Sequence, residues 1–225
     1  GRELYEQKFA YDIQSGFTIE ELFERAKANK EKLTADMAVH AKQLWPKYFG
    51  KKKMPAARTE LIGQVVAKVS EKHSKPENFV NDVRAQIPQL EKFVREKDLL
   101  DQDATKPLVV RETPSFSPTR GVAIASIDAP GPFNPGAPTY YNVNPMSDFT
   151  PQRAEGFLRE YNDWMLQILN IHEAVPGHYT QLLHANRSPS VVKSLLGNGT
   201  MIEGWAVYGE RMMLENGWGN ESPEL

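Results

Sequence analysis

The sequence contains no cysteine, which excludes disulfide bonds and thiolate metal sites. It has no run of eighteen apolar residues, so no segment is expected to span a membrane. The formal net charge is only −2, which indicates no nucleic-acid or membrane-surface partner. Internal repeats and low-complexity tracts are also absent. The 225 residues, 40% of them hydrophobic, suffice for one large domain or two small ones with a substantial core.

The charge and the secondary-structure pattern both change near the middle of the chain. Residues 1–106 carry 20 lysines and arginines against 17 acidic residues, whereas residues 107–225 carry 7 against 12. The acidic second part is compatible with a carboxylate-lined site. We expect a helical N-terminal part over residues 1–105 and a part with a small sheet over residues 106–225, the two forming one continuous structural unit.

Three helices are predicted in the first part, over residues 18–49, 59–73 and 76–100, from their apolar periodicity. Thr18 followed by Glu21 fits a capping box at the start of the first helix. Pro88 is expected to kink or split the third. His40 and His73 have no acidic or histidine partner at ligand spacing, so we expect ordinary surface or packing residues.

Three short β-branched runs predict a small, largely antiparallel sheet: "KPLVVRET", "GVAIASID" and "PTYYNVNP". The third run, bounded by prolines, is expected to be an edge strand at Tyr140–Asn144. An edge strand can hold an extended peptide by pairing with it, which makes Tyr140, Asn142 and Asn144 candidate substrate-binding residues. The alternative is an ordinary packed strand. A further helix is predicted to start at Thr150 and to lead straight into His172.

The stretch "NIHEAVPGHYTQ", residues 170–181, almost contains the zinc-protease signature H-E-x-x-H. In that signature two histidines four residues apart face one zinc ion, and the glutamate takes a proton from the metal-bound water. Here His178 follows His172 by six residues. In an unbroken helix six residues turn through about 600°, so the two imidazoles would point to different sides.

The residues between the two histidines predict that the helix is interrupted. Pro176 has no N–H and its ring would clash with the carbonyl group of His172. Val175, directly before proline, is pushed away from helical angles, and Gly177 permits angles closed to other residues. If two residues are looped out, a spacing of six acts as a spacing of four and both rings can face one metal ion. The alternative is two packed histidines beside a chance glutamate.

A third metal ligand is available in "TMIEGWAVYGERM", residues 200–212, which is predicted to be a helix. Glu203 and Glu210 are seven residues apart and lie on one face, so one can bind the metal while the other orients a ligand histidine. Residues 185–199 are expected to form a turn, a short helix and a second turn, which brings this helix back alongside the first. The alternative is that both glutamates face solvent.

The motifs "HEAVPGHYTQ" and "EGWAVYGE" together resemble the bacterial DUF885 family, which is similar to gluzincin metallopeptidases. The resemblance is dense from about residue 140 to residue 220. It implies a zincin-like helical enzyme in which His172, His178 and Glu203 bind Zn²⁺ and Glu173 is the general base. It also implies a longer protein, of which this chain is a fragment, and a location in the bacterial periplasm or cell envelope.

The predicted function is zinc-dependent hydrolysis of a peptide substrate. The oxyanion needs a hydrogen-bond donor, for which Tyr208 is the candidate and Tyr179 and Tyr140 are open alternatives. Glu210 is expected to support a ligand histidine. His184 is a spare ligand or, as we expect, an outer partner or an exposed residue. The fold class is α+β, mostly α.

The sequence leaves two other functions open. One is a module that binds metal without turnover, and the other is a helical interaction domain in which "VPG" is merely a kink. Metal content separates the last of these from the rest, since only that function predicts none. Oligomeric state is not indicated by the sequence.

Overall fold

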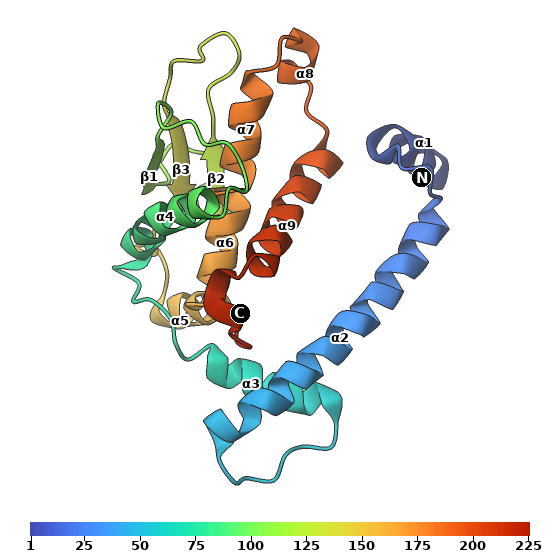
Figure 1. Ribbon diagram of the computed structural model, residues 1–225, viewed down its shortest axis with the longest axis vertical. Helices are drawn as coiled ribbons and strands as arrows, with labels where there is room; N and C mark the ends of the chain where they lie inside the picture. Colours follow the sequence, from blue (N-terminus) through green and yellow to red (C-terminus); the bar gives the residue numbers. More distant parts are fainter. The chain divides into compact units, whose positions relative to one another are not determined.

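The computed structural model describes all 225 residues and confirms a mostly helical α+β fold with one small sheet (Figure 1). Two compact units form, one from residues 1–71 and the other, apart from Glu224, from residues 72–225. None of the helices combines the length and the apolar character needed to cross a bilayer. The elements of the first unit are α1 (Arg2–Ile13), α2 (Ile19–Phe49) and α3 (Arg58–Val69). Those of the second are α4 (Phe79–Glu96), β1 (Leu108–Glu112), β2 (Ala125–Asp128), β3 (Thr139–Val143), α5 (Pro151–Glu160), α6 (Met165–Glu173), α7 (His178–Asn186), α8 (Val191–Leu195), α9 (Gly199–Glu215) and a final 3₁₀ turn (Trp218–Glu221).

In the first unit, α2 begins at the predicted capping box. The Glu21 amide donates to Thr18 Oγ1 at 3.1 Å, and the Glu21 carboxylate accepts from the Thr18 amide at 2.8 Å. The C-terminal part of α2 packs on α3 around Trp45 and Leu61. Farther toward the N-terminus the predicted apolar stripe stays in solvent, with Leu33 53% exposed. The apolar periodicity of the sequence does not predict α1, in which no residue is buried.

In the second unit, α4 supplies a continuous apolar stripe to the main core. Its buried residues are Phe79, Val83, Ile87, Leu90 and Val94. They pack toward α6 and β1. The helix is shorter than predicted, and Pro88 lies inside it without splitting it.

The sheet is mixed, with the strand order β1–β3–β2. β1 pairs with β3 in parallel, with Val110 opposite Tyr141, and β2 pairs with β3 in the antiparallel sense, with Ile127 opposite Tyr141. The prediction that Tyr140–Asn144 is an edge strand is therefore wrong. The flanking prolines lie outside the paired residues, and four of the five residues of β3 are buried, as suits a central strand. The free edges belong to β1 and β2.

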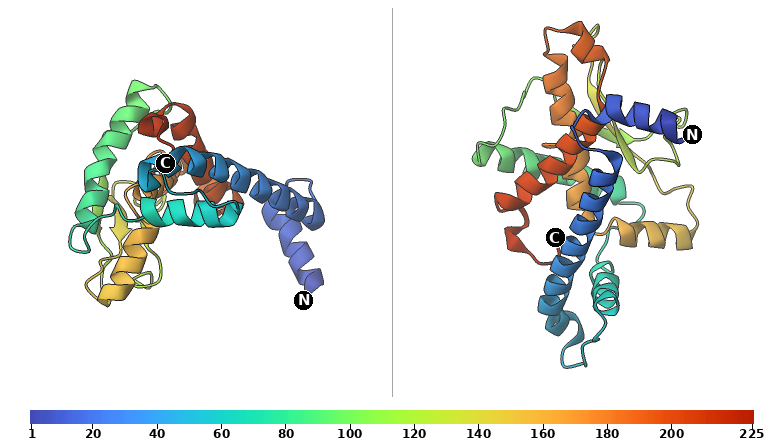
Figure 2. Two further views of the ribbon diagram at one scale, coloured as in Figure 1. Left: turned by 90° about the horizontal axis from the view of Figure 1, so that it is seen from below. Right: turned by 90° about the vertical axis from the view of Figure 1, so that its right-hand side faces the viewer.

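The predicted helix from Thr150 to His172 is two helices, α5 and α6. Thr150 caps α5 as predicted, accepting from the Arg153 amide at 3.3 Å, with Pro151 in the first turn. Asn162 lies between the two helices and separates them. Its Oδ1 accepts from the amides of Trp164 at 3.1 Å and Met165 at 3.3 Å, so that α6 starts anew there. Figure 2 shows the two helices running in different directions.

Candidate metal centre

The predicted interruption between the two histidines is present. α6 ends at Glu173 and α7 begins at His178. The Gly177 amide donates to Ile171 O at 2.9 Å, which folds the chain back onto the end of α6. A Cβ atom on Gly177 would lie 1.7 Å from His172 O, so only glycine fits. Gly177 has φ −74° and ψ −131°, which is neither helical nor extended, and the close approach of its Cα to His172 O is a second reason for glycine at this position.

The interruption brings His172 and His178 side by side, with ring centroids 4.8 Å apart. Both Nε2 atoms face the same oxygen of Glu203, at 3.4 Å from His172 and 3.7 Å from His178. One ligand atom from each of the three residues lies within 4.8 Å of the others. Three side chains from three helices thus converge on one point, and α9 runs alongside α6 and α7 (Figure 1).

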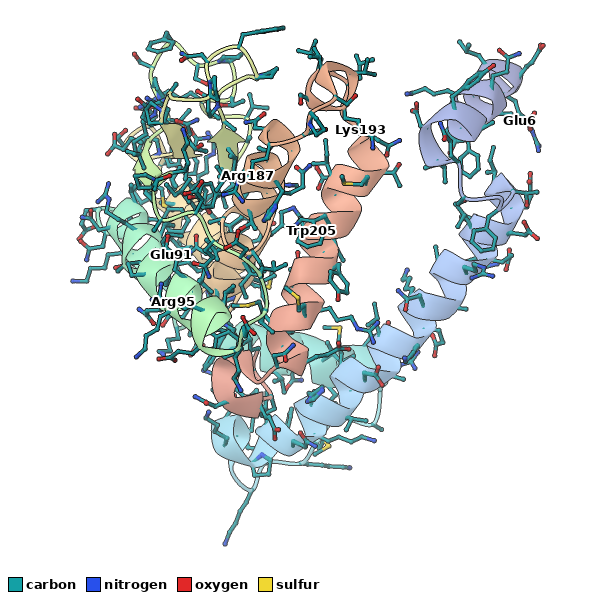
Figure 3. All side chains as sticks on the ribbon, turned by 45° about the horizontal axis from the view of Figure 1, so that its top comes forward. Glu6, Glu91, Arg95, Arg187, Lys193 and Trp205 are labelled. Atoms are coloured by element: carbon teal, nitrogen blue, oxygen red, sulfur yellow. The ribbon has the colours of Figure 1, made fainter.

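The position of α9 is set by contacts with the interruption itself. Trp205 lies on α9 (Figure 3). Its indole Nε1 donates to Pro176 O at 2.9 Å. A Cβ atom on Gly209 would touch the Pro176 ring at 3.5 Å, so α9 passes close to the loop. The helix begins where Asn198 Oδ1 accepts from the Met201 amide at 2.9 Å, after the predicted short helix α8. These contacts hold the start of α9, and with it Glu203, over the histidines.

The two histidines are supported differently. His172 Nδ1 lies 2.6 Å from Glu210 Oε1, and this hydrogen bond raises the pKa of His172 in spite of partial burial. His178 has no such carboxylate partner, and burial lowers its pKa. Its Nδ1 is buried without a hydrogen-bond partner, and so is Gln181 Oε1 one turn along α7.

Glu173 lies at the end of α6, directly after His172. Burial raises the pKa of its carboxyl group, with His172 acting in the opposite sense. No hydrogen bond from the protein stabilises the ionised carboxylate. The charge of Glu173 adds to the effect of burial in raising the pKa of Tyr141, whose hydroxyl donates to Asn170 Oδ1 at 2.9 Å. Glu173 is thus a carboxylate whose proton affinity is raised and whose oxygens are uncommitted.

The donor set fits a zinc ion. Two imidazole nitrogens and one carboxylate oxygen are the ligands of a common catalytic zinc site, which leaves a fourth position open for water. The side chain of Glu203 is 64% exposed, so solvent reaches this side of the cluster. His172 and His178 point their Nε2 atoms inward, which leaves both Nδ1 atoms free for supporting hydrogen bonds, as ligand histidines require.

No hydrogen bond joins any of the three tyrosines considered as oxyanion donors to this cluster. Tyr208 is 54% exposed and turned about 140° around α9 from Glu203. The hydroxyl of Tyr179 donates to Lys106 O. The ring of Tyr140 lies under the guanidinium group of Arg111 at 3.5 Å.

The two asparagines of the predicted substrate strand make hydrogen bonds within the protein. Asn142 Oδ1 accepts from Arg111 Nε at 2.7 Å. Asn144 accepts from the Gly121 amide at 3.1 Å and donates to Ala123 O. Both therefore stabilise the sheet and the loop before β2.

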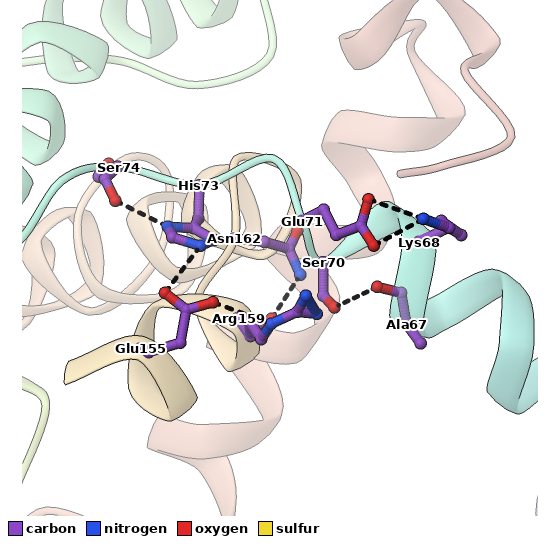
Figure 4. Close-up of polar contacts among 9 residues, drawn as sticks. All are labelled: Ala67, Lys68, Ser70, Glu71, His73, Ser74, Glu155, Arg159 and Asn162. Carbon is purple, nitrogen blue, oxygen red and sulfur yellow. Dashed lines mark hydrogen bonds and ion pairs between the residues drawn. The ribbon is translucent and has the colours of Figure 1, made fainter. Parts of the chain in front are cut away.

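The other histidines do not join the cluster. His40 is exposed. His73 is half-buried and lies 3.5 Å from Glu155, a carboxylate of α5 that sequence spacing did not reveal (Figure 4). His184 is exposed on α7, with its Nε2 3.4 Å from Asp101 O. His184 lines a cavity of about 590 Å³ and is turned about 120° around α7 from His178.

Two buried polar features near the site could not be predicted from the sequence. One is the buried chain of hydrogen bonds from Tyr141 through Asn170 to Gln86, which fixes α6 beside β3 and α4. The other is Gln181, for which the only available signal was its spacing of three residues from His178. The pattern of apolar residues indicates neither.

Known proteins similar to this chain identify its family. No curated protein matches the sequence. A structure from Shewanella oneidensis, described as a "putative lipoprotein of unknown function", is 54% identical with a TM-score of 0.90; the match covers 100% of this chain and 39% of that one. A structure from Colwellia psychrerythraea, described as a "putative lipoprotein", is 16% identical with a TM-score of 0.71. That match covers 98% of this chain and 35% of the Colwellia chain, and it shows a shared fold alone. The chain thus spans about two fifths of the length of the Shewanella protein. A family model of bacterial proteins of unknown function matches residues 1–224, and the chain belongs to this family, DUF885.

Proposed function

We propose that this chain carries the zinc site of a metallopeptidase that hydrolyses peptide bonds with water. The convergence of His172, His178 and Glu203 within 4.8 Å carries the proposal, because only the interruption of the helix makes it possible. When bound there, zinc supplies Lewis-acid activation of water and of a peptide carbonyl group. The three residues hold the ion, and Glu210 orients the ring of His172 through their 2.6 Å contact.

Glu173 is the proposed general base. Its carboxylate accepts a proton from the attacking water and delivers it to the leaving amine. Burial supports this role, because it raises the pKa of Glu173 toward the working pH, where a carboxylate is a better base. The absence of a hydrogen-bond donor on the carboxylate acts in the same direction.

An extended peptide would pair with β2 rather than with β3. β3 is hydrogen-bonded on both sides, whereas β2 has one free edge and contacts α6. Backbone pairing at that edge would hold a peptide near the end of α6 without requiring particular side chains. Location in the bacterial envelope is part of the proposal, since both similar structures are described as putative lipoproteins.

A second candidate is a metal-binding module without turnover. It is favoured by the contacts of the three tyrosines, none of which is hydrogen-bonded to the cluster, and by the chain's coverage of only 39% of the Shewanella protein. An oxyanion donor would then have to come from outside these 225 residues.

Zinc content and Glu173→Gln separate the candidates. Elemental mass spectrometry is expected to find about one zinc per chain in the wild type and in Glu173→Gln. Hydrolysis of a mixed peptide library, followed by mass spectrometry, is expected in the wild type and lost in Glu173→Gln. Glu160→Gln, at the corresponding last position of α5, is the matched control and should keep both properties. Zinc without hydrolysis in the wild type would favour the second candidate, and no zinc after reconstitution would exclude both.

A further inference from the structure

We propose that Gln181 positions His178 for metal binding, with its Oε1 accepting the hydrogen bond from the Nδ1–H of the imidazole. The inference rests on the proposed zinc site and names the residue that fixes the ring of its second histidine. Gln181 itself touches neither zinc nor substrate, so it is a positioning residue.

The first observation is a matched pair of unsatisfied atoms. Throughout the chain, His178 Nδ1 and Gln181 Oε1 are the buried side-chain nitrogen and oxygen atoms that lack a hydrogen-bond partner. Buried polar atoms are rarely left unpaired, because each has lost its contact with water. One of these two is a ring nitrogen that can carry a proton, and the other is an acceptor only.

The second observation is that both residues belong to the same side of α7. Three residues along a helix turn it through about 300°, so the side chains of His178 and Gln181 are neighbours with Cβ atoms about 5–6 Å apart. The opposite side of α7, with Thr180 and Leu183, lines the separate cavity. Rotation of the Gln181 side chain can therefore bring its amide oxygen to the ring without moving the helix.

The third observation fixes which atom donates. His178 directs Nε2 toward Glu203, 3.7 Å away, so coordination uses Nε2. A neutral imidazole that binds metal through Nε2 carries its proton on Nδ1. The buried Nδ1 must then donate, and Gln181 Oε1 is the buried acceptor without another partner.

The choice of an amide, rather than a carboxylate, suits the charge of this cluster. Glu173, Glu203 and Glu210 already surround the two histidines. A fourth carboxylate would repel them in a partly buried site, whereas a glutamine supplies the acceptor without charge. His172 takes the charged support from Glu210, and His178 takes the neutral support from Gln181.

The test measures zinc affinity by competition with a chromophoric chelator, with the whole chain and zinc alone as the ligand. Gln181→Leu removes the acceptor at similar size and is expected to weaken zinc binding by about 10- to 100-fold. Gln181→Glu keeps an acceptor oxygen but adds a charge next to the other carboxylates, so its loss of zinc affinity is expected to be smaller than that of Gln181→Leu. Thr180→Val, a buried substitution on the opposite side of α7, is the matched control and should leave the affinity unchanged.

A second readout reports on the ring itself. In the zinc-loaded wild type, ¹⁵N chemical shifts of the histidine side chains should show His178 protonated on Nδ1, with slow exchange of that proton with solvent. In Gln181→Leu the same proton should exchange faster. Circular dichroism of each variant establishes that it is folded before either measurement.

The outcomes separate this inference from the zinc site itself. If the wild type binds no zinc, the proposed function fails. Should the wild type bind zinc and Gln181→Leu bind it equally well, the zinc site stands and the role of Gln181 is refuted. Equal losses in Gln181→Leu, Gln181→Glu and Thr180→Val would also refute it, because they would reflect packing of α7 rather than the acceptor.

Discussion

The end of α6 and the start of α7 each present one histidine to the carboxylate of Glu203. The surroundings of the other ring nitrogen, Nδ1, differ between the two histidines. On α6, His172 is held by the charged Glu210 of α9 at 2.6 Å. On α7, His178 meets Glu203 through Nε2, but its Nδ1 is buried without a partner. The pKa of His172 is consequently raised by its hydrogen bond, and that of His178 is lowered by burial.

In the proposed zinc site, this difference would combine high metal affinity with weak competition from protons. A carboxylate behind a ligand histidine makes the imidazole a stronger donor to metal, but it also favours protonation. Burial without a charge keeps the second imidazole neutral and ready to coordinate. Substitutions of the two histidines and of their neighbours, and the pH dependence of stability, test this difference.

The largest expected effect is loss of His178 itself. His178→Ala should weaken zinc binding by more than about 100-fold, beyond the range for loss of an outer partner, because it removes a ligand. His184→Ala is the matched control on α7, since that exposed ring contacts Asp101 O instead of the cluster. The comparison is made by chelator competition. Unchanged affinity in His178→Ala would mean that zinc is held elsewhere.

Gly177→Ala is expected to destabilise the fold at the point where the two helices meet. The added Cβ would lie 1.7 Å from His172 O, a backbone atom that cannot rotate away. We expect the free energy of unfolding to fall by about 3 kcal/mol or more, as for severe steric substitutions. Gly156→Ala, within α5 and with nothing within 4 Å, should instead change it by about 1 kcal/mol or less, in the stabilising direction. Urea denaturation measures both, and similar values would contradict the close approach.

Replacing the charged partner of His172 by a neutral one tests the difference between the two histidines. Glu210→Leu should lower zinc affinity by about 10- to 100-fold, since it removes the partner of His172. Glu210→Gln keeps an acceptor but no charge, so it gives His172 the neutral support proposed for His178. Its loss of affinity is therefore expected to be smaller than that of Glu210→Leu. Equal losses in the two variants would show that charge, rather than the hydrogen bond, is what His172 requires.

The smallest expected effect concerns stability in the zinc-free protein. The two histidines contribute to it with opposite dependence on pH. The raised pKa of His172 stabilises the fold fully below the ordinary histidine value of 6.5, and this stabilisation is lost as pH rises through the higher folded value. The lowered pKa of His178 means that the unfolded chain takes up its proton first, so the fold loses stability as pH falls below 6.5.

These signs predict how two variants differ from wild type. His172→Gln should cost more stability at about pH 5 than at about pH 8, and His178→Gln should cost less at the lower pH. Urea unfolding with a chelator present measures each difference. A common direction for both variants would contradict the contrast between the two supports.

Local chemistry made much of the fold predictable. The capping box at Thr18, the cap at Thr150 and the interruption around Pro176 all follow from residues within one or two turns. The break at Asn162 was not predicted, because asparagine is tolerated within helices. What marks the break is the hydrogen bond from the Met165 amide to the Asn162 side chain, which the sequence alone does not reveal. The helix α1 was missed because its apolar residues form no stripe that could be buried.

Long-range pairing was not predictable in the same way. The order of strands depends on which run packs against α4 and α6, and β-branched content alone cannot place β3 between β1 and β2. The spacing of Glu203 and Glu210 did predict that they share a face, and both lie beside the histidines. Gln181 had no comparable signal, because a glutamine three residues after a histidine is common on any helix surface.

The convergence of His172, His178 and Glu203 has a consequence for a chain that lacks cysteine. A zinc ion held by these residues would act as a cross-link, closing a loop of about 30 residues between the end of α6 and the start of α9. By loop-closure entropy, such a link is worth on the order of 3–4 kcal/mol, comparable to that of a disulfide over the same span. The same three side chains that the chain offers for chemistry would then also fasten its C-terminal helices together.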